Sequence, residues 1–160
     1  MKTIIIVLLY TFYSVSVYCC SCIGESKLKS AIKSSDYIFI GSVIDINHKA
    51  VVDTFIVDEL DSLYFLDTMY VNEITFRIVT LYKGKKRSEE IKIITGLGSG
   101  DCGFEFDNGK EYIVYSYYQY KPDAYDEKTR YRFLYTDICS RTRLSTSGAE
   151  VKVLNEIFRK

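Results

Sequence analysis

Five stretches of the chain carry the apolar pattern that predicts β-strands. Residues 37–46 form a nearly continuous apolar run, and residues 74–81 and 90–95 alternate apolar with polar side chains. Two further aromatic stretches predict strands over 112–120 and 131–135. Successive strand residues point to opposite faces of a sheet, so each alternating segment offers one face to a core.

Two other stretches have helical spacing. In residues 26–34, Leu28, Ala31 and Ile32 lie three and four positions apart and share one face, with Ser26 as the expected cap. A second helix is expected over residues 147–160, with Ser147 and Glu150 spaced as a capping box. Its apolar stripe is expected to consist of Ala149, Val153, Leu154 and Ile157.

Polar and glycine-rich segments separate these elements. Residues 48–72 are interpreted as a long protruding hairpin or loop, because acidic residues crowd this stretch. Turns are expected over 83–86 and over 107–110, where Asn108-Gly109 is a typical tight-turn pair. Residues 96–103 and 121–128 read as loops. Short strands separated by turns, with two flanking helices, predict a mainly β fold built on a small closed antiparallel barrel.

Composition agrees with one globular, strand-rich domain. The chain has 160 residues, of which 15% are aromatic and 26% charged, with a single proline. Acidic and basic residues balance at 21 each, which argues against nucleic acid as the main partner. The only dense basic run is Lys83 to Arg87.

The N-terminus has the features of an export signal. Lys2 precedes the apolar run 4–10, and no further charge occurs up to Tyr18. Cleavage between Cys19 and Cys20 divides the chain into a signal peptide, 1–19, and a mature domain, 20–160, without a transmembrane segment. The expected location is therefore extracellular. An uncleaved signal anchor and a lipid-anchored envelope protein are the alternatives.

Removal of the signal leaves an even number of cysteines. These are Cys20, Cys22, Cys102 and Cys139, and an even count in an exported chain predicts two disulfides. A Cys20–Cys22 bridge would be strained, so each of these two residues is expected to pair with a distant cysteine, in either order. Each bridge would close a long loop and contribute roughly 4–5 kcal/mol in the chain-entropy model. Free buried thiols are the alternative.

Catalytic constellations are not evident in the sequence. His48 is the only histidine and is expected on the solvated surface, which leaves no histidine base paired with a nucleophile. The acidic run 58–61 lacks the glycine and ligand spacing of a calcium loop, and no helix motif follows the glycines of 96–103 to form a phosphate loop. The chain is therefore expected to be neither an enzyme nor a cofactor-binding protein.

An ordered set of motifs resembles the tissue inhibitors of metalloproteinases, a netrin-like family. The start Cys20-Ser21-Cys22 looks like the Cys-x-Cys start of that family, and Tyr82-Lys83-Gly84 resembles one of its turns. The segments 31–36, 102–103 and 109–114 are similar to further family segments, and Cys139 followed by Leu144-Ser145 and a helix resembles the end of its inhibitory domain. The resemblance covers most of the mature chain.

The resemblance implies a fold, a disulfide pairing and a mechanism. It implies a five-stranded OB-fold barrel with the bridges Cys20–Cys102 and Cys22–Cys139. It also implies a partner, a zinc metalloproteinase, whose catalytic zinc would be coordinated by the α-amino group and carbonyl of Cys20. Ser21 would enter the adjoining pocket. The inhibitory contact would comprise Cys20, Ser21, Cys22, Ser99, Gly100, Asp101 and Cys102, and the hairpin over 51–69 would reach the target's rim.

The chain also departs from the family pattern. Lys33 stands where animal inhibitors have a cysteine, and the sequence has no counterpart of their second, six-cysteine domain. Two alternative functions therefore stand beside inhibition. One is a netrin-like binding or adhesion module without inhibitory action, and the other is an exported hydrolase dependent on an acidic residue such as Asp61.

Overall fold

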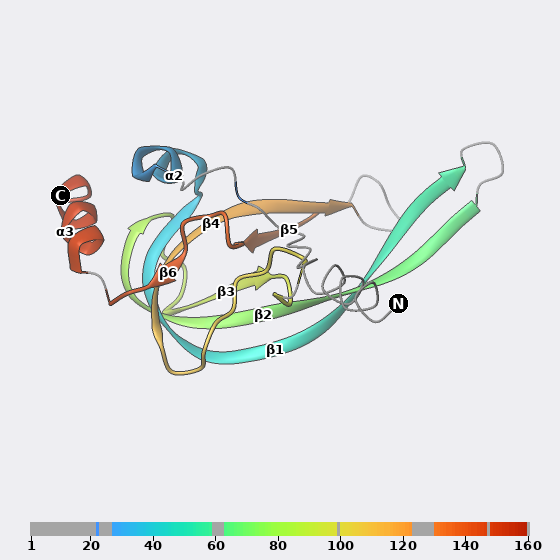
Figure 1. Cartoon of the computed structure of the whole chain (residues 1–160), viewed down its shortest axis with the longest axis horizontal. Coiled ribbons are helices and arrows are strands. Elements are labelled where there is room, and N and C mark those ends of the chain that lie inside the picture. The colour runs from blue at the N-terminus through green and yellow to red at the C-terminus, as the bar shows by residue number, and fades with distance from the viewer. Residues whose placement is uncertain are drawn as a thin grey trace, which may run out of the picture.

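The computed structural model describes Cys22 and residues 27–58, 63–98, 100–122, 130–146 and 148–159, with the backbone alone at 51–58, 63–69, 120–122 and 130–131. Six strands form one sheet, and two helices lie outside it (Figure 1). The strands are β1 (Tyr37–Asp58), β2 (Leu63–Lys83), β3 (Glu90–Thr95), β4 (Glu111–Pro122), β5 (Arg130–Tyr135) and β6 (Arg143–Leu144). The helices are α2 (Leu28–Ser34) and α3 (Gly148–Ile157).

Five of the strands close into a ring. The sheet order is β1-β2-β3-β5-β4, and β4 pairs back onto β1 between Tyr37↔Ser116 and Ser42↔Glu111. This confirms a mainly β fold with a C-terminal helix. The expectation that every pairing is antiparallel was wrong, because β3 and β5 run parallel at Ile94↔Tyr135. A closing contact between strands far apart in the chain leaves no mark on the local apolar pattern.

The core has two parts, one on each face of β1 and β4. The first collects residues from all five strands of the ring, including Phe39, Phe76 and Val114. The second lies between the ring and the helices, where Ile38 and Tyr115 pack with Leu154. Neighbouring residues of one strand thus serve different clusters, which explains why 37–46 reads as a continuous apolar run rather than an alternating one.

A two-stranded arm extends from the ring. β1 and β2 remain paired beyond their contacts with β4 and β3, as far as Asp58↔Leu63, and project away from the rest of the sheet (Figure 1). The stretch read as a hairpin or loop over 48–72 therefore contains two antiparallel paired strands, with a register shift between Ile56 and Asp58, and residues 59–62 between them lie outside the described residues. His48 lies at the base of this arm and is exposed, as expected.

The C-terminal helix has a different buried face from the expected one. Leu154 is fully buried, but Val153 and Ile157 are 39% and 50% exposed. The position that joins Leu154 in the interior is Glu150, 7% exposed, whose carboxylate contacts lie in the protein core rather than at the helix start. The apolar stripe was wrong because a charged residue can occupy a core-facing position when other segments neutralise it.

The expected helix caps and the expected turn over 107–110 differ in part from the structure. The first helix begins at Leu28 after Lys27, which provides no side-chain cap, and the proposed caps Ser26 and Ser147 lie outside the described residues. The Asn108-Gly109 turn is present and bonds to Val43 of β1, but residues 101–107 before it form no strand. Within the described part of the chain, no helix is long and apolar enough to cross a membrane.

Candidate functional site

Cys22, the second cysteine of the Cys-x-Cys motif, is attached to the turn that follows β5. Cys22 forms a disulfide with Cys139, 117 positions later, which is the pairing that the family resemblance implies. Cys102 is also disulfide-bonded. Three other predicted contact residues, Cys20, Ser21 and Ser99, lie outside the described residues, as therefore does the proposed Cys20–Cys102 bridge.

Cys102 and Cys139, the predicted partners of Cys20 and Cys22, lie on adjacent backbone segments. We call these two cysteines the anchors. The backbone N–H of Ile138, the residue before Cys139, donates to the carbonyl of Cys102 over 3.0 Å. Two cysteines separated by one residue on an extended chain lie on the same side, about 7 Å apart. The predicted pairing needs the partners of Cys20 and Cys22 to lie close together, and this hydrogen bond brings Cys102 and Cys139 onto adjacent backbone segments.

Side-chain hydrogen bonds hold the turn that carries Cys139. The carboxylate of Asp137 accepts from the Cys139 N–H at 2.9 Å and from the Tyr117 hydroxyl at 2.9 Å. Burial, together with this bond to Asp137, raises the pKa of Tyr117, so the phenol stays protonated as a donor. Ser140 closes the turn by donating to the Asp137 carbonyl at 2.7 Å. Cys139 is thus displayed on a fixed backbone.

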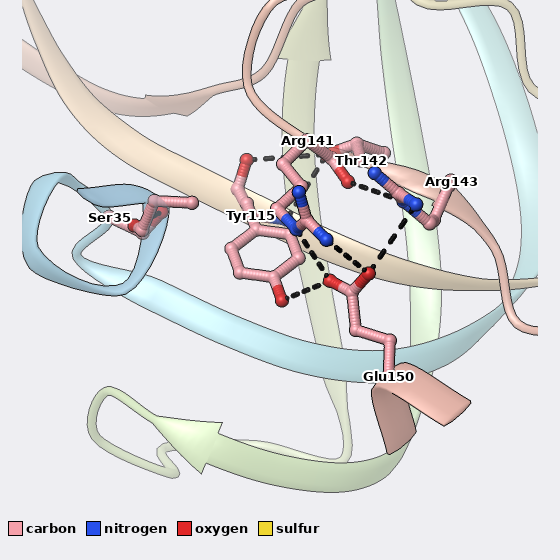
Figure 2. A network of polar contacts seen from close by, with 7 residues as sticks. Ser35, Tyr115, Arg141, Thr142, Arg143 and Glu150 are labelled. Atoms are coloured by element: carbon pink, nitrogen blue, oxygen red, sulfur yellow. Dashed lines mark hydrogen bonds and ion pairs between the residues drawn. The ribbon is translucent and has the colours of Figure 1, made fainter. Parts of the chain in front are cut away.

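A buried polar network continues inward from this turn. The hydroxyls of Thr136 and Thr142 lie 2.7 Å apart, and Thr136 donates to the carbonyl of Tyr115 on β4. The Tyr115 hydroxyl in turn donates to Glu150 of α3 at 2.6 Å (Figure 2). The network therefore connects the cysteine turn, the ring and the C-terminal helix.

Glu150 is the charged centre of this network. Its carboxylate accepts from Nε and Nη2 of Arg141, each at 2.9 Å, and lies 3.4 Å from Nη1 of Arg143 (Figure 2). Burial alone would raise the pKa of Glu150, but the bonds from Arg141 and Tyr115 and the charges of the two arginines hold it below its ordinary value. Glu150 is therefore ionised at neutral pH and fully occupied by protein donors, which suits a structural role.

The second anchor, Cys102, belongs to a loop organised around one carboxylate. Asp101 accepts backbone N–H bonds from Leu97, Gly98 and Gly103. Burial favours a raised pKa for Asp101, but these N–H groups together lower it, so the loop closes on an ionised centre. A side chain on Gly103 would overlap the backbone of Gly96, so the neck of the loop requires glycine there.

Exposed apolar side chains flank the two anchors. Leu97 is 43% exposed and Ile138 is 44% exposed. Tyr70, 59% exposed, lies two residues from Asn72, whose side-chain amide donates to the carbonyl of Gly96. We call one set of residues the anchored rim. It consists of the exposed Leu97, Ile138 and Tyr70 and the disulfide-bonded Cys22, Cys102 and Cys139. Exposed apolar residues beside rigid backbone are typical of surfaces that bind macromolecules.

A groove of about 450 Å³ lies between α2 and the turn that carries Cys139, and Cys139 itself lines it. It contains the carboxylates of Asp36 and Asp137, but Asp36 accepts from the Tyr118 N–H at 2.8 Å and Asp137 is occupied as described above. Both carboxylates thus accept hydrogen bonds from other groups of the protein. Among the described residues, no three His, Cys, Asp or Glu side chains are grouped so that they could hold a metal ion.

The sequence pattern identified the cysteines and the 96–103 loop but did not reveal the side chains that hold them in place. The sequence Asp137-Ile138-Cys139-Ser140 has the spacing of a side-chain-capped turn, and that signal was available. The partners Tyr115, Arg141 and Glu150 meet only in the folded chain. A scan against protein-family models and a search of curated proteins both find no match to this chain.

Proposed function

We propose that this chain is an exported, single-domain inhibitor of zinc metalloendopeptidases that acts through its Cys-x-Cys start. The five-stranded ring would be an OB-fold barrel of the netrin-like kind. Mature Cys20 would be bridged to Cys102, so that its amine and carbonyl could chelate the catalytic zinc of a target protease. The proposal rests on the motif resemblance together with the geometry of the anchored rim.

The observation that carries the proposal is the bond between Ile138 and Cys102. It brings Cys102 and Cys139 onto neighbouring backbone segments, and this supports the proposal because a chelating N-terminus held by two bridges would need its two partners close together. A segment pinned twice loses little conformational freedom on binding, so more of its contact energy appears as affinity. The Asp101 and Asp137 turns serve the same end because they hold both anchors rigid.

The chemistry of an N-terminal amine suits this role. An α-amino group titrates at pH about 7.7–8.0, so deprotonation at neutral pH costs little. The neutral amine is a nitrogen ligand of the type zinc prefers, and a catalytic zinc keeps one open position for it. Ser21 would then enter the pocket beside the zinc, while Leu97, Ile138 and Tyr70 contact the walls of the cleft.

The decisive experiment extends the mature N-terminus by one alanine before Cys20. The native protein is expected to inhibit a panel of zinc endopeptidases, and the extended protein to lose at least about 100-fold in affinity because its amine is displaced from the zinc. One alanine added after Lys160 provides the matched control. Equal inhibition by the native and the N-terminally extended protein would refute the proposal. So would a native protein that inhibits no member of the panel.

Intact-mass and N-terminal analysis of the exported protein distinguishes inhibition from the alternative function, a binding or adhesion module. An unmodified Cys20 amine agrees with inhibition. A lipid-sized mass increment at Cys20 would favour the binding or adhesion module anchored to an envelope, because a modified cysteine can neither bridge to Cys102 nor offer a free amine.

A further inference from the structure

The C-terminal helix α3 carries an apolar stripe that does not face the core. Ala149, Val153 and Ile157 recur every four residues, so they lie along one side of the helix. All three are exposed, Val153 by 39% and Ile157 by 50%. They form a continuous strip along the helix rather than isolated surface residues. We call these three residues the outer stripe.

Contacts on two other sides of α3 fix the orientation of the helix. Leu154 is fully buried, and Glu150, one turn before it, is bound by Arg141 (Figure 2). On a different side of the helix, the side-chain oxygen of Asn155 accepts a hydrogen bond from the Tyr82 hydroxyl at 2.9 Å. A rotation that buried the outer stripe would break these contacts, so the stripe stays on the surface.

Opposite charges border the outer stripe on its solvent side. At about 100° per residue, Lys152 and Glu156 lie next to the stripe on the side away from Leu154. Both are exposed. The border thus carries one positive and one negative charge four residues apart, which is a pattern that an antiparallel copy of the same helix complements.

We propose that two copies of this chain associate through α3, with the helices antiparallel and one outer stripe against the other. With Val153 on the two-fold axis, Ala149 of each copy faces Ile157 of its partner, so a small residue meets a large one. The rise of about 1.5 Å per residue then places Lys152 of one copy about 3 Å along the axis from Glu156 of the other, twice in each pair. A parallel pair would not bring these charged borders together.

The position of α3 and the chemistry of its border agree with a second copy as the partner. The helix lies at one end of the molecule, outside the ring, so another helix can approach it there (Figure 1). A helix that lies in a bilayer surface has a wide apolar face and a basic polar face, whereas this stripe is narrow and has an acidic residue on its border.

The size of the outer stripe sets the strength of the association. A helix of 10 residues is about 15 Å long, so two packed copies bury less than the roughly 800 Å² per partner of a stable complex. We therefore expect a reversible dimer with a dissociation constant of about 0.1–1 mM. No residue of the anchored rim belongs to α3, so such a dimer would carry two rims, and it does not depend on protease inhibition.

The test is sedimentation equilibrium of the exported protein at up to about 1 mM and low ionic strength, where charge pairs are least screened. The mass of the native protein should rise towards that of a dimer. Val153→Asn should associate at least about 10-fold more weakly, because it removes apolar contact at the two-fold axis. Val79→Asn, the same change at a residue of β2 that is 58% exposed, is the matched control and should associate like the native protein.

Charge reversal tests the antiparallel arrangement. Lys152→Glu alone and Glu156→Lys alone should each associate at least about 5-fold more weakly, because like charges meet at both contacts. An equimolar mixture of these two variants should associate as well as the native protein, because each charge then meets its opposite. Lys29→Glu, on the exposed side of α2, is the matched control and should leave association unchanged.

Three results would overturn the proposal. They are a native protein that stays monomeric at about 1 mM, an association that Val153→Asn does not weaken, and a mixture of the charge variants that associates no better than either alone. Binding to phosphatidylglycerol vesicles that depends on Val153, without self-association, would identify lipid as the partner and would also overturn it.

Discussion

Replacing Glu150 by glutamine tests how α3 is held to the ring. The change keeps the size of the side chain and an acceptor for the Tyr115 hydroxyl, but it removes the charge that Arg141 and Arg143 face. Arg141 is only 15% exposed at its side chain, so its cation would be left in a poorly hydrated place. We therefore expect α3 to be bound much more weakly.

The magnitude follows from the burial of the pair. Removing one partner of a buried ion pair costs about 3–5 kcal/mol, and the lower end applies because Arg143 is 33% exposed and glutamine retains an acceptor. A loss of about 3 kcal/mol lowers the urea midpoint by roughly 1–2 M for a domain of this size. Glu156→Gln, on the exposed face of the same helix, should change stability by less than about 0.5 kcal/mol.

The pH dependence gives a second readout. A carboxyl whose folded pKa lies below its unfolded value contributes stability that is complete above the unfolded pKa and lost as pH falls through the folded one. Because the pKa of Glu150 is lowered from 4.5, the stability gap between the native protein and Glu150→Gln should be constant above about pH 5 and shrink at lower pH.

Two outcomes would refute this reasoning. One is an unchanged urea midpoint in Glu150→Gln, and the other is a gap that persists undiminished in acid. The double variant Arg141→Met/Glu150→Gln should regain part of the loss, because the buried Arg141 cation is removed together with the carboxylate charge while the glutamine oxygen still accepts from the Tyr115 hydroxyl. A double variant as unstable as the sum of its two single changes would show that the residues are not coupled.

Two further predictions concern the anchors, and a third concerns the end of α2. Replacing both Cys22 and Cys139 by alanine should cost about 4–5 kcal/mol in urea unfolding, because their bridge joins residues 117 positions apart; a difference under about 1 kcal/mol would contradict the chain-entropy account. Gly103→Ala should destabilise the protein by more than about 2 kcal/mol because its methyl group would overlap the Gly96 backbone, whereas Gly148→Ala, in open space, should be neutral in the same thermal scan. Lys83→Met should cost about 1–3 kcal/mol and increase amide exchange at the end of α2, where its ammonium donates to Ile32 and Ser35; Lys92→Met, which removes a surface pair, should leave that exchange unchanged.

Local patterns in the sequence were sufficient for most of the elements. Period-two alternation located β3 at residues 90–95 and the part of β2 that lies in the ring, while an apolar run located that of β1 and aromatic stretches those of β4 and β5. Cysteine spacing and the export signal predicted that the N-terminal cysteines pair with distant partners, and Cys22 does so. These features can be read locally because they depend on residues close together in the chain.

Only the tertiary structure decided which segments meet. The closure of β4 on β1, the parallel contact of β3 with β5 and the continued pairing of the arm join strands whose order no local pattern encodes. Glu150 could take a core-facing position only because Arg141, nine residues earlier, and Tyr115 of β4 are folded against it. Arg132 of β5 likewise stacks on Tyr118 only because β4 and β5 pair in the folded sheet. The sequence thus determined where strands and loops lie and which cysteines have distant partners. Long-range packing brings together charged residues that are far apart in the sequence, and it determined which side chains hold the proposed site.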